Sequence, residues 1–233
     1  MKKEKSFKTL LFLSLIIFII IGSIYTYKKF YSKEYAKAPK NSHDCLSVEQ
    51  AIRNRRSIRS YDKNPITKTE LFKLLFAAQG ITNKKRSLRA APSAGQTYPL
   101  EIYIATGNVK DLEQGIYKYN PKTNTINKVE SGDKRQELCN SSLEQEWVKE
   151  ASAVIIICAN YKKTTQKYVE RGKRYVHMEV GAVAENIYLQ SQPLNIGTVF
   201  VGAFNENKIK QVIKAQKDEE PLCLMPLGKI STN

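Results

Sequence analysis

The most hydrophobic part of the chain lies near its start. Residues 9–27 read TLLFLSLIIFIIIGSIYTY, contain no charged side chain and have lysines on both sides. A helix of this length crosses the ~30 Å hydrocarbon core of a bilayer. A cleaved signal peptide is the alternative interpretation, although no A-x-A-like cleavage site follows the run. We therefore expect a basic tail over residues 1–8, a transmembrane anchor or signal peptide over 9–27, and a polar linker over 28–43.

This apolar run also sets the expected location of the protein. A retained anchor predicts a single-pass membrane protein, whereas cleavage predicts a secreted protein. Because lysines flank the run on both sides, the positive-inside rule does not choose between the two orientations. The sequence therefore leaves open the side of the membrane on which residues 44–233, the expected folded domain, would lie.

Within the expected domain, the spacing of apolar residues predicts several helices. Ser47 with Gln50, and Thr67 with Glu70, have the spacing of capping boxes, in which two side chains satisfy backbone N–H groups at the start of a helix. A long helix is expected where apolar residues recur at every third or fourth position before Pro193. The predicted helices cover residues 48–56, 71–79, 134–150, 169–191 and 205–214.

Other segments alternate apolar and polar residues, or are continuously apolar, as strands are. Residues 153–159 read AVIIICA, an unbroken run that is typical of a strand buried on both faces, and Cys158 within it is expected in the core. The predicted strands cover residues 101–105, 115–119, 153–159, 197–202 and 222–225. Helices and strands in this order predict an α+β fold with one sheet and packed helices.

Composition removes several classes of protein. Hydrophobic residues make up 42% of the 233 residues and charged residues 26%, which are ordinary values for a globular protein. The formal net charge is +16, but the lysines are scattered and no arginine-rich helix or aromatic RNA-binding pattern accompanies them. We therefore expect no nucleic-acid partner. Four Cys without a C-x-x-C pair, and two His, lead us to expect no metal site.

The densest chemical signal is the segment 53–59, which reads RNRRSIR. Guanidinium groups bind phosphate through two parallel hydrogen bonds, and a serine hydroxyl adds a short one. Four arginines and one serine within seven residues therefore favour an anion site at the end of the first predicted helix. A solvated basic surface is the alternative, because exposed arginines are common.

A second signal is the loop 89–99, RAAPSAGQTYP, which lies directly before the first predicted strand. Its small residues let backbone N–H groups approach a flat ligand closely, and Pro92 and Pro99 stiffen the loop. Gln96 is placed to hydrogen-bond the edge of such a ligand. An ordinary tight loop is the alternative interpretation.

Together, these two segments resemble the nitroreductase-like flavoprotein superfamily, and in particular its SagB-type branch. Further matching motifs are GIYKY at 115–119, ERGKRYVHMEVG at 170–181 and NIGTVFVGAF at 195–204. The resemblance implies a nitroreductase-like fold, with a central, mostly antiparallel sheet flanked by helices. It also implies bound FMN, NAD(P)H as the electron donor, and a homodimer that holds each FMN in its interface around the helix 169–191.

The resemblance assigns roles to particular residues. The arginine segment, Arg55–Arg59, meets the charged regions of FMN, where cations stabilise the reduced flavin anion. The small-residue loop, Pro92–Gln96, lines the flavin ring, a later segment passes its N5 side, and Lys229 contacts the phosphate. We expect the arginine segment and the small-residue loop to enclose one FMN. The cofactor-binding residues implied are Arg55, Arg56, Ser57, Arg59, Pro92, Ser93, Ala94, Gly95, Gln96, Val201, Gly202, Ala203 and Lys229.

The resemblance also assigns proton abstraction to Lys167 and Tyr168, as in azoline-oxidising members of the SagB-type branch. A lysine that is desolvated beside a flavin can act as a general base; the alternative is a surface dipeptide at the start of the long helix. The predicted function is an FMN-dependent oxidoreductase that transfers hydride, in a ping-pong reaction, between a small-molecule donor and acceptor. Two alternatives remain, an azoline dehydrogenase acting on a modified peptide and a non-catalytic, membrane-tethered scaffold with the same fold.

Overall fold

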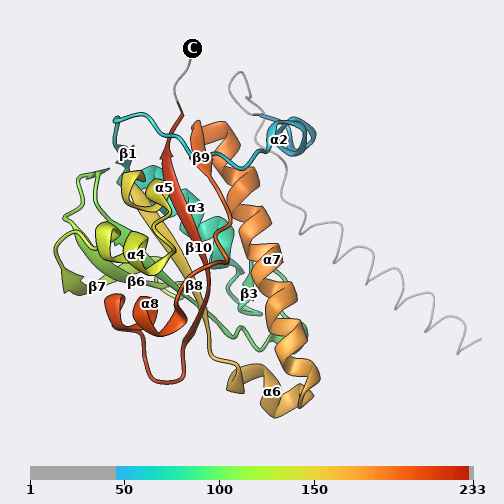
Figure 1. Ribbon diagram of the computed structural model, residues 1–233. Helices are drawn as coiled ribbons and strands as arrows, with labels where there is room; N and C mark the ends of the chain where they lie inside the picture. The colour runs from blue at the N-terminus through green and yellow to red at the C-terminus, as the bar shows by residue number, and fades with distance from the viewer. Residues whose placement is uncertain (1–45, 231–233) are drawn as a thin grey trace, which may run out of the picture. The chain divides into compact units, whose positions relative to one another are not determined.

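The computed structural model of the chain describes residues 46–230 (Figure 1). The tail, the anchor or signal peptide, and the linker predicted over residues 1–43 lie outside the described residues. Within the described part of the chain, no helix combines the length and the apolar character that crossing a bilayer requires.

A six-stranded sheet forms the centre of the fold, in the order β7-β6-β4-β8-β10-β9. Every neighbouring pair in this sheet is antiparallel. The predicted α+β architecture and the mostly antiparallel sheet are therefore confirmed. The strands are β4 (Leu100–Thr106), β6 (Gly115–Asn120), β7 (Thr125–Ser131), β8 (Ala153–Ala159), β9 (Ile196–Thr198) and β10 (Glu220–Lys229).

Two short strand pairs lie outside this sheet. β1 (Ile66–Thr67) pairs in parallel with β5 (Val109–Lys110). β2 (Ile81–Asn83) pairs antiparallel with β3 (Leu88–Arg89). The second pair carries the chain from the end of a helix into the small-residue loop and so fixes where that loop begins.

Helices cover both faces of the central sheet (Figure 1). α3 and the long helix α7 pack on one face, whereas α4, α5 and α8 pack on the other. α6 leads into α7, and α2 adjoins the far end of α7. The helices are α2 (Val48–Asn54), α3 (Lys68–Gln79), α4 (Arg135–Ser141), α5 (Glu146–Glu150), α6 (Lys162–Tyr168), α7 (Arg171–Ser191) and α8 (Glu206–Val212), with 3₁₀ turns η1 (Ala94–Gln96) and η2 (Gln192–Leu194).

The central position of β8 explains its unbroken apolar sequence. Ile155 and Ile157 belong to the core under α3 and α7, whereas Val154, Ile156 and Cys158 belong to the core under the other helices. All five side chains are fully buried, and each large aliphatic side chain removed from water contributes about 1.5–3 kcal/mol. Cys158 is a core residue, as predicted.

The helix starts that were predicted from capping residues are confirmed. The Ser47 hydroxyl accepts the N–H of Gln50, and the Thr67 hydroxyl accepts the N–H of Glu70, each within a complete capping box. Asn205 caps α8 in the same way. Such a cap stabilises a helix by about 1 kcal/mol. The helices therefore start in the folded chain where the capping residues predict.

The predicted ends of two helices are wrong. The helix expected over 169–191 starts at Arg171 and follows a separate helix, α6, because the chain breaks at Val169 with a φ of 50°. The backbone of α6 comes so close to α7 that a Cβ on Gly172 would lie 2.8 Å from a Cα atom of α6. The helix expected over 134–150 similarly divides into α4 and α5. Apolar spacing alone does not reveal such breaks.

One strand was not predicted, and two other predicted elements end earlier in the structure. β7 has a mostly exposed edge-strand pattern, so its sequence lacks the apolar alternation that would have revealed it. The helix expected over 48–56 ends at Asn54, because the N–H of Ile58 binds the carbonyl of Thr198 and draws the chain toward β9. The strand expected over 197–202 ends at Thr198, and beyond it only Val201 is bridged, to Leu224.

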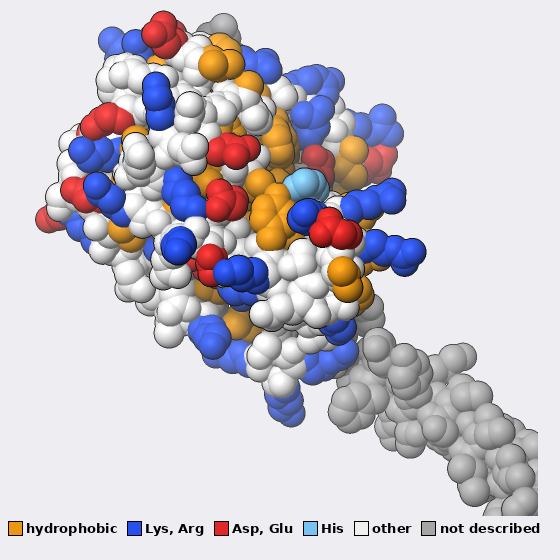
Figure 2. Space-filling model, turned by 60° about the horizontal axis from the view of Figure 1, so that its bottom comes forward, with side chains coloured by type: hydrophobic (Ala, Val, Ile, Leu, Met, Phe, Trp, Pro, Cys, Tyr) orange, Lys and Arg blue, Asp and Glu red, His pale blue; other side chains and the backbone are white. Residues whose placement is uncertain are grey.

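Charged side chains are spread over the surface of the described domain. Figure 2 shows the end at which α6 lies, where lysine and arginine side chains outnumber acidic ones but are interspersed with them. Several are paired, including Lys162 with Asp218 and Lys163 with Glu101. Exposed pairs of this kind contribute little to stability, because water screens them.

Candidate functional site

The arginine segment is an extended stretch that connects α2 to the sheet. The chain leaves the helix at Arg55, which has a φ of −50° and a ψ of 122°. Three residues later, the N–H of Ile58 donates to the carbonyl of Thr198 at 2.9 Å. The segment therefore lies beside the end of β9, where the backbone that follows, 199–203, leaves the sheet.

The guanidinium groups of the segment rest on aromatic rings instead of carboxylates. Arg55 lies 5.2 Å from the ring centre of Tyr188, and Arg59 lies 5.4 Å from that of Trp147. Arg56 donates only to nearby backbone carbonyls. Among the described residues, none of these three arginines forms an ion pair. The segment therefore presents positive charge that no acidic side chain in this part of the chain neutralises.

Tyr188, on α7, joins the arginine segment to the backbone beyond β9. Its hydroxyl lies 3.1 Å from Oγ of Ser57 and accepts the N–H of Phe200 at 2.7 Å. Farther along, the exposed N–H groups of Gly202 and Ala203 donate to no group in the described part of the chain. The structure thus brings together the predicted residues 55–59 and 201–203. The sequence analysis missed Tyr188, for which the available signal was a hydroxyl within the apolar stripe of α7.

The small-residue loop packs against the predicted catalytic pair. Gly95 has a φ of +57°, and a Cβ placed on it would lie 2.5 Å from the Tyr168 hydroxyl and 2.6 Å from Nζ of Lys167. Nζ of Lys167 is 3.4 Å from the Gly95 carbonyl oxygen. The positive φ favours glycine at this position, and the ends of the Lys167 and Tyr168 side chains would have to move to make room for a Cβ. Lys167 and Tyr168 lie at the end of α6, so they are not at the start of the long helix.

Polar contacts within the loop and with α6 and α7 hold the loop in place. The Ser93 hydroxyl accepts the N–H of Tyr98 at 2.9 Å, and Thr97 and Thr164 join their hydroxyls at 2.8 Å. Glu179 of α7 is buried nearby. Burial raises the pKa of Glu179, and contacts with Ser93 and other polar groups offset only part of that rise. Its Oε1 atom has no hydrogen-bond partner in the structure.

Glu179 is a second residue that the sequence analysis missed. The signal was a carboxylate on the apolar stripe of α7, because Val176, Val180 and Val183 around it are all buried. Charged side chains are seldom fully buried without a structural or functional reason. Here the carboxylate contacts Ser93 of the small-residue loop.

Lys229 is engaged differently from the arginines. Its ammonium donates to Oε1 of Glu70 at 2.6 Å and to the carbonyl of Leu194 at 2.9 Å. Burial acts to raise the pKa of Glu70, but the hydrogen bonds from Lys229 and Thr67 outweigh it and lower the pKa. The Lys229 side chain therefore has protein partners that already neutralise its charge.

Within one chain, the arginine segment and the small-residue loop lie apart. The loop contacts Tyr168, whose ring packs against Tyr175 near the start of α7 at 5.1 Å between centres. The arginine segment contacts Tyr188, near the end of the same helix. The loop also meets α7 itself, at Glu179, which contacts Ser93. Nine residues separate Glu179 from Tyr188, or ~14 Å along the helix at 1.5 Å per residue. Within one chain, the two groups therefore contact different turns of α7.

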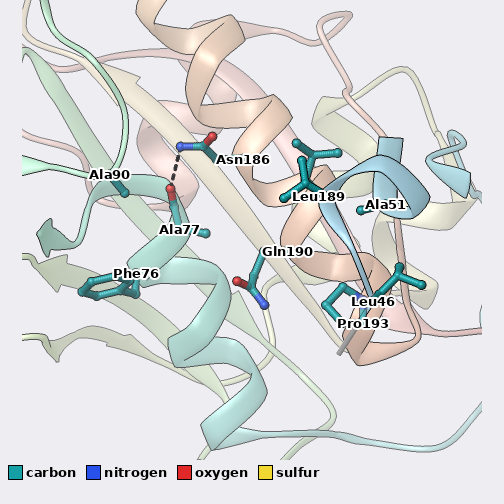
Figure 3. Close-up of a pocket in the computed structure, with 10 residues that line it drawn as sticks. Leu46, Ala51, Phe76, Ala77, Ala90, Asn186, Leu189, Gln190 and Pro193 are labelled. Carbon is teal, nitrogen blue, oxygen red and sulfur yellow. Dashed lines mark hydrogen bonds between the residues drawn. The ribbon is translucent and has the colours of Figure 1, made fainter. Parts of the chain in front are cut away.

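An apolar groove lies beside the end of α7, between α2 and α3 (Figure 3). It has a volume of about 350 Å³, and its walls include Leu46, Phe76, Leu189 and Pro193. Figure 3 shows the amide of Asn186 donating to the backbone of α3 at 3.0 Å across one end of the groove. Large apolar side chains stay exposed around it: Val48 (70%), Ile52 (57%) and Phe76 (41%).

The sequence profile of the nitroreductase family matches residues 52–229. The match covers most of the chain, including both the arginine segment and the small-residue loop, so the chain belongs to the nitroreductase family and is an oxidoreductase. Members of this family generally use FMN with NAD(P)H as the donor, and are typically homodimers.

Two curated relatives support this assignment. Protein MJ1384 of Methanocaldococcus jannaschii, provisionally named a nitroreductase, is 45% identical over 184 residues, which are 79% of this chain and 91% of the relative. The microcin B17-processing protein McbC of Escherichia coli is 24% identical over 177 residues, which are 73% of this chain and 65% of McbC.

Solved structures share the fold. A provisionally named nitroreductase from Anabaena variabilis has a TM-score of 0.70 and 30% identity over 79% of this chain, which spans only 38% of the Anabaena chain. A chain of the E. coli microcin synthetase McbBCD complex, with truncated pro-MccB17 bound, has a TM-score of 0.66 and 21% identity, over 88% of this chain and 81% of that one. The NADPH:FMN oxidoreductase of Vibrio harveyi, complexed with NAD⁺, has a TM-score of 0.57 and 18% identity, over 80% of this chain and 70% of that one. At such identities, the last two show a common fold.

Proposed function

We propose that this chain is an FMN-dependent oxidoreductase that works as a homodimer. In this proposal, each FMN lies between the arginine segment of one protomer and the small-residue loop of the other. The observation that carries the proposal is the placement of the two groups on different turns of α7, ~14 Å apart along the helix in one chain. A twofold axis that pairs two α7 helices in opposite directions would bring the arginine end of each copy toward the loop end of its partner.

The donor set on the chain fits FMN. Arg55 and Arg59 have no carboxylate partners among the described residues, so their charge is available to a phosphate or to an anionic ring. Arg56 and the Ser57 hydroxyl stand in the same segment. The unused N–H groups of Gly202 and Ala203 suit the edge of a flat heterocycle.

Each group then has a separate task in the proposed site. Bound FMN supplies two-electron (hydride) chemistry, which passes in ping-pong fashion from NAD(P)H, the proposed donor, to a small-molecule acceptor. The arginine segment would bind the negative charge of FMN and stabilise the additional negative charge of the reduced ring. The small-residue loop closes the other side of the proposed cofactor site and excludes water, through Pro92, Ser93, Ala94, Gly95 and Gln96. Val201, Gly202 and Ala203 orient the ring through backbone N–H groups. Lys229 could bind the phosphate only if its ammonium gave up the ion pair with Glu70.

The apolar groove beside α7 supports a second copy as its cover. Covering exposed side chains such as Val48, Ile52 and Phe76 would favour association by about 25 cal/mol for each Å² of apolar surface removed from water. The groove lies near the same end of α7 as the arginine segment, so one interface would bury the apolar surface and complete the cofactor site.

The colour of the purified protein tests the proposal directly. A yellow protein that bleaches anaerobically with NADPH or dithionite is expected, with one FMN per chain and a dimeric mass in solution. Replacing both Arg55 and Arg59 by Gln should remove the colour, whereas Arg53→Gln should keep it, because Arg53 is exposed and paired with Glu49. A colourless protein that refuses added FMN would contradict the proposal.

Azoline oxidation on a modified peptide is the second candidate function. It is favoured by the position of Lys167, whose ammonium lies 3.4 Å from the carbonyl of Gly95 in the small-residue loop. The similarity to McbC, which is named as a microcin B17-processing protein, is compatible with a peptide substrate. Lys167 would then abstract the proton, and Tyr168 would assist. Lys167→Ala should abolish azoline oxidation, whereas Lys162→Ala on the same helix should not. Full activity of Lys167→Ala would exclude this function.

For residues outside the described part, the proposal keeps the organisation expected from sequence. In this organisation, residues 1–8 form a basic tail, and residues 9–27 anchor the protein in a membrane or act as a signal peptide. Residues 28–43 form the linker to the folded domain, 44–233, which carries out the reaction. Resistance of the full chain to alkaline carbonate extraction tests the anchor. A C-terminal reporter fusion tests the side of the membrane, which decides whether NAD(P)H is within reach.

A further inference from the structure

We propose that the chain carries a second ligand site, separate from the cofactor site, that binds a small anion with a carboxylate or phosphate group. The site is a cavity of about 400 Å³ where β4 begins and β6 ends. We call it the basic pocket. The residues of its wall that the argument uses are Gln79, Arg89, Glu101, Lys118, Lys122 and Lys163.

The charges of the basic pocket do not balance. Its wall holds four cations (Arg89, Lys118, Lys122 and Lys163) and one carboxylate, Glu101. The end of the molecule that bears α6 shows more basic than acidic side chains in Figure 2. A concave surface with one sign of charge concentrates counter-ions, because its low-dielectric walls focus the field.

Ion pairs account for only two of the four cations. Glu101 binds both Lys163 and Lys118, and Lys118 also binds Glu219. Neither Arg89 nor Lys122 forms an ion pair with any described residue. Lys122 is exposed, so water solvates its charge. Arg89 is only partly exposed, and its charge needs another partner.

The surroundings of Arg89 point to an anion. Its Nη1 atom donates to Oε1 of Gln79 at 2.6 Å, and its guanidinium lies 4.5 Å from the ring centre of Tyr98. Both partners are uncharged. Burial lowers the pKa of Arg89, while the charges of Glu101 and Glu179 act in the opposite direction and offset only part of the effect. A partly buried cation that lacks a direct ion pair is costly, and a bound anion would supply one.

The amide of Gln79 stands between Arg89 and the buried carboxylate of Glu179, which contacts it. Gln79 is 1% exposed, and its Nε2 atom completes no hydrogen bond of good geometry among the described residues. Its oxygen is occupied by Arg89, so the orientation of the amide is fixed. A ligand that drew Arg89 toward the pocket would change the contacts of this amide too.

Two hydrogen bonds link the basic pocket to the small-residue loop. The backbone N–H of Arg89 donates to the Tyr98 hydroxyl at 3.3 Å, and the N–H of Tyr98 donates to Oγ of Ser93 at 2.9 Å. An anion bound to Arg89 would therefore affect the position of the small-residue loop, which we assign to the cofactor site. Ligand affinity and cofactor affinity should be coupled in both directions. The volume suits a metabolite of modest size.

Calorimetric titration of the full chain tests this site. FMN is added beforehand, so that the cofactor site is not available to phosphate, and the ionic strength is held constant with chloride. Inorganic phosphate is one probe and succinate the other, which separates a phosphate ligand from a carboxylate ligand. We expect saturable binding of one probe per chain, about tenfold weaker in Arg89→Gln and several-fold weaker in Lys122→Gln, as loss of a charged hydrogen bond implies.

Controls decide between a built site and general attraction. Lys84→Gln removes an exposed lysine outside the pocket and should leave the affinity unchanged. If Arg89→Gln fails to fold, Lys122→Gln gives the answer alone, because its side chain is exposed. No saturable binding of either probe, equal weakening in Lys84→Gln, or full affinity in Lys122→Gln and in any folded Arg89→Gln would overturn the proposal. Since the titration is read independently of colour, its failure would leave the flavin proposal standing.

Discussion

The hydroxyl oxygen of Tyr188 lies 3.1 Å from Oγ of Ser57 and accepts the backbone N–H of Phe200 at 2.7 Å. One hydroxyl thus joins the long helix, the arginine segment and the backbone beyond β9, which are far apart in sequence. The ring below it also carries the guanidinium of Arg55. Tyr188 therefore positions the residues that we assign to the cofactor.

Tyr188→Phe tests this positioning role, because it keeps the ring and removes only the hydroxyl. Losing a shared hydrogen bond costs about 1 kcal/mol, so we expect the affinity for FMN to fall roughly fivefold. Fluorescence quenching of FMN measures it. Tyr117→Phe is the control, since it also loses one hydroxyl-to-backbone bond, at 3.0 Å, but on β6. Equal effects of both variants would contradict a specific role.

Gly95→Ala should impair the small-residue loop. The new methyl group would fall 2.5 Å from the Tyr168 hydroxyl and 2.6 Å from Nζ of Lys167, at a φ of +57°. We expect steady-state turnover to drop at least about tenfold, from displacement of the loop by about 1 Å. Gly132→Ala separates strain from contact, because its φ is +86° but nothing lies within 4 Å. It should lose about 1 kcal/mol of stability and keep its turnover.

Subunit mixing tests whether the two halves of a site come from different copies. Chains with Arg55→Gln and Arg59→Gln are co-expressed with chains carrying Gly95→Ala, and the heterodimer is isolated through two tags. If sites are shared across a dyad, one of the two sites contains no substitution, and about half of the wild-type turnover returns. If each chain completes its own site, the heterodimer will be no more active than either variant alone.

The buried carboxylate of Glu179 should make stability depend on pH. Burial raises its pKa above the ordinary value of 4.5, so the folded chain holds the proton more tightly than the unfolded chain. The resulting stabilisation is full at low pH and is lost as pH rises through the folded pKa. Glu179→Gln carries no such titration. Its Tm should match that of wild type near pH 4 and exceed it by about 2–4 °C at neutral pH.

A matched control for this measurement lies on the same helix. Glu185 is exposed on α7, so Glu185→Gln should follow the wild-type Tm at every pH. Melting curves recorded by circular dichroism between pH 4 and 8 give the comparison. A Glu179→Gln variant that is less stable than wild type at neutral pH would mean that the carboxylate is stabilised as an anion, opposite to our expectation.

Local signals in the sequence determined a large part of this fold. The capping boxes at Ser47 and Thr67 and the cap at Asn205 fix the starts of helices through side chains three residues away. The apolar run of β8 requires a strand covered on both faces. The arginine segment and the small-residue loop were also visible, because each concentrates one kind of chemistry in a few consecutive residues. These features depend on neighbours in the chain, so one sequence suffices to find them.

Only the tertiary structure decided what the remaining residues do. The break at Val169 follows from the close crossing of α6 over Gly172, and the hydroxyl of Tyr188 gains its role from Ser57, 131 residues away. The ~14 Å along α7 between the arginine segment and the loop is set by which turns of the helix each of them contacts. Such relationships arise because folding brings distant residues into contact, and no local pattern of apolar and polar positions records which distant residues these will be.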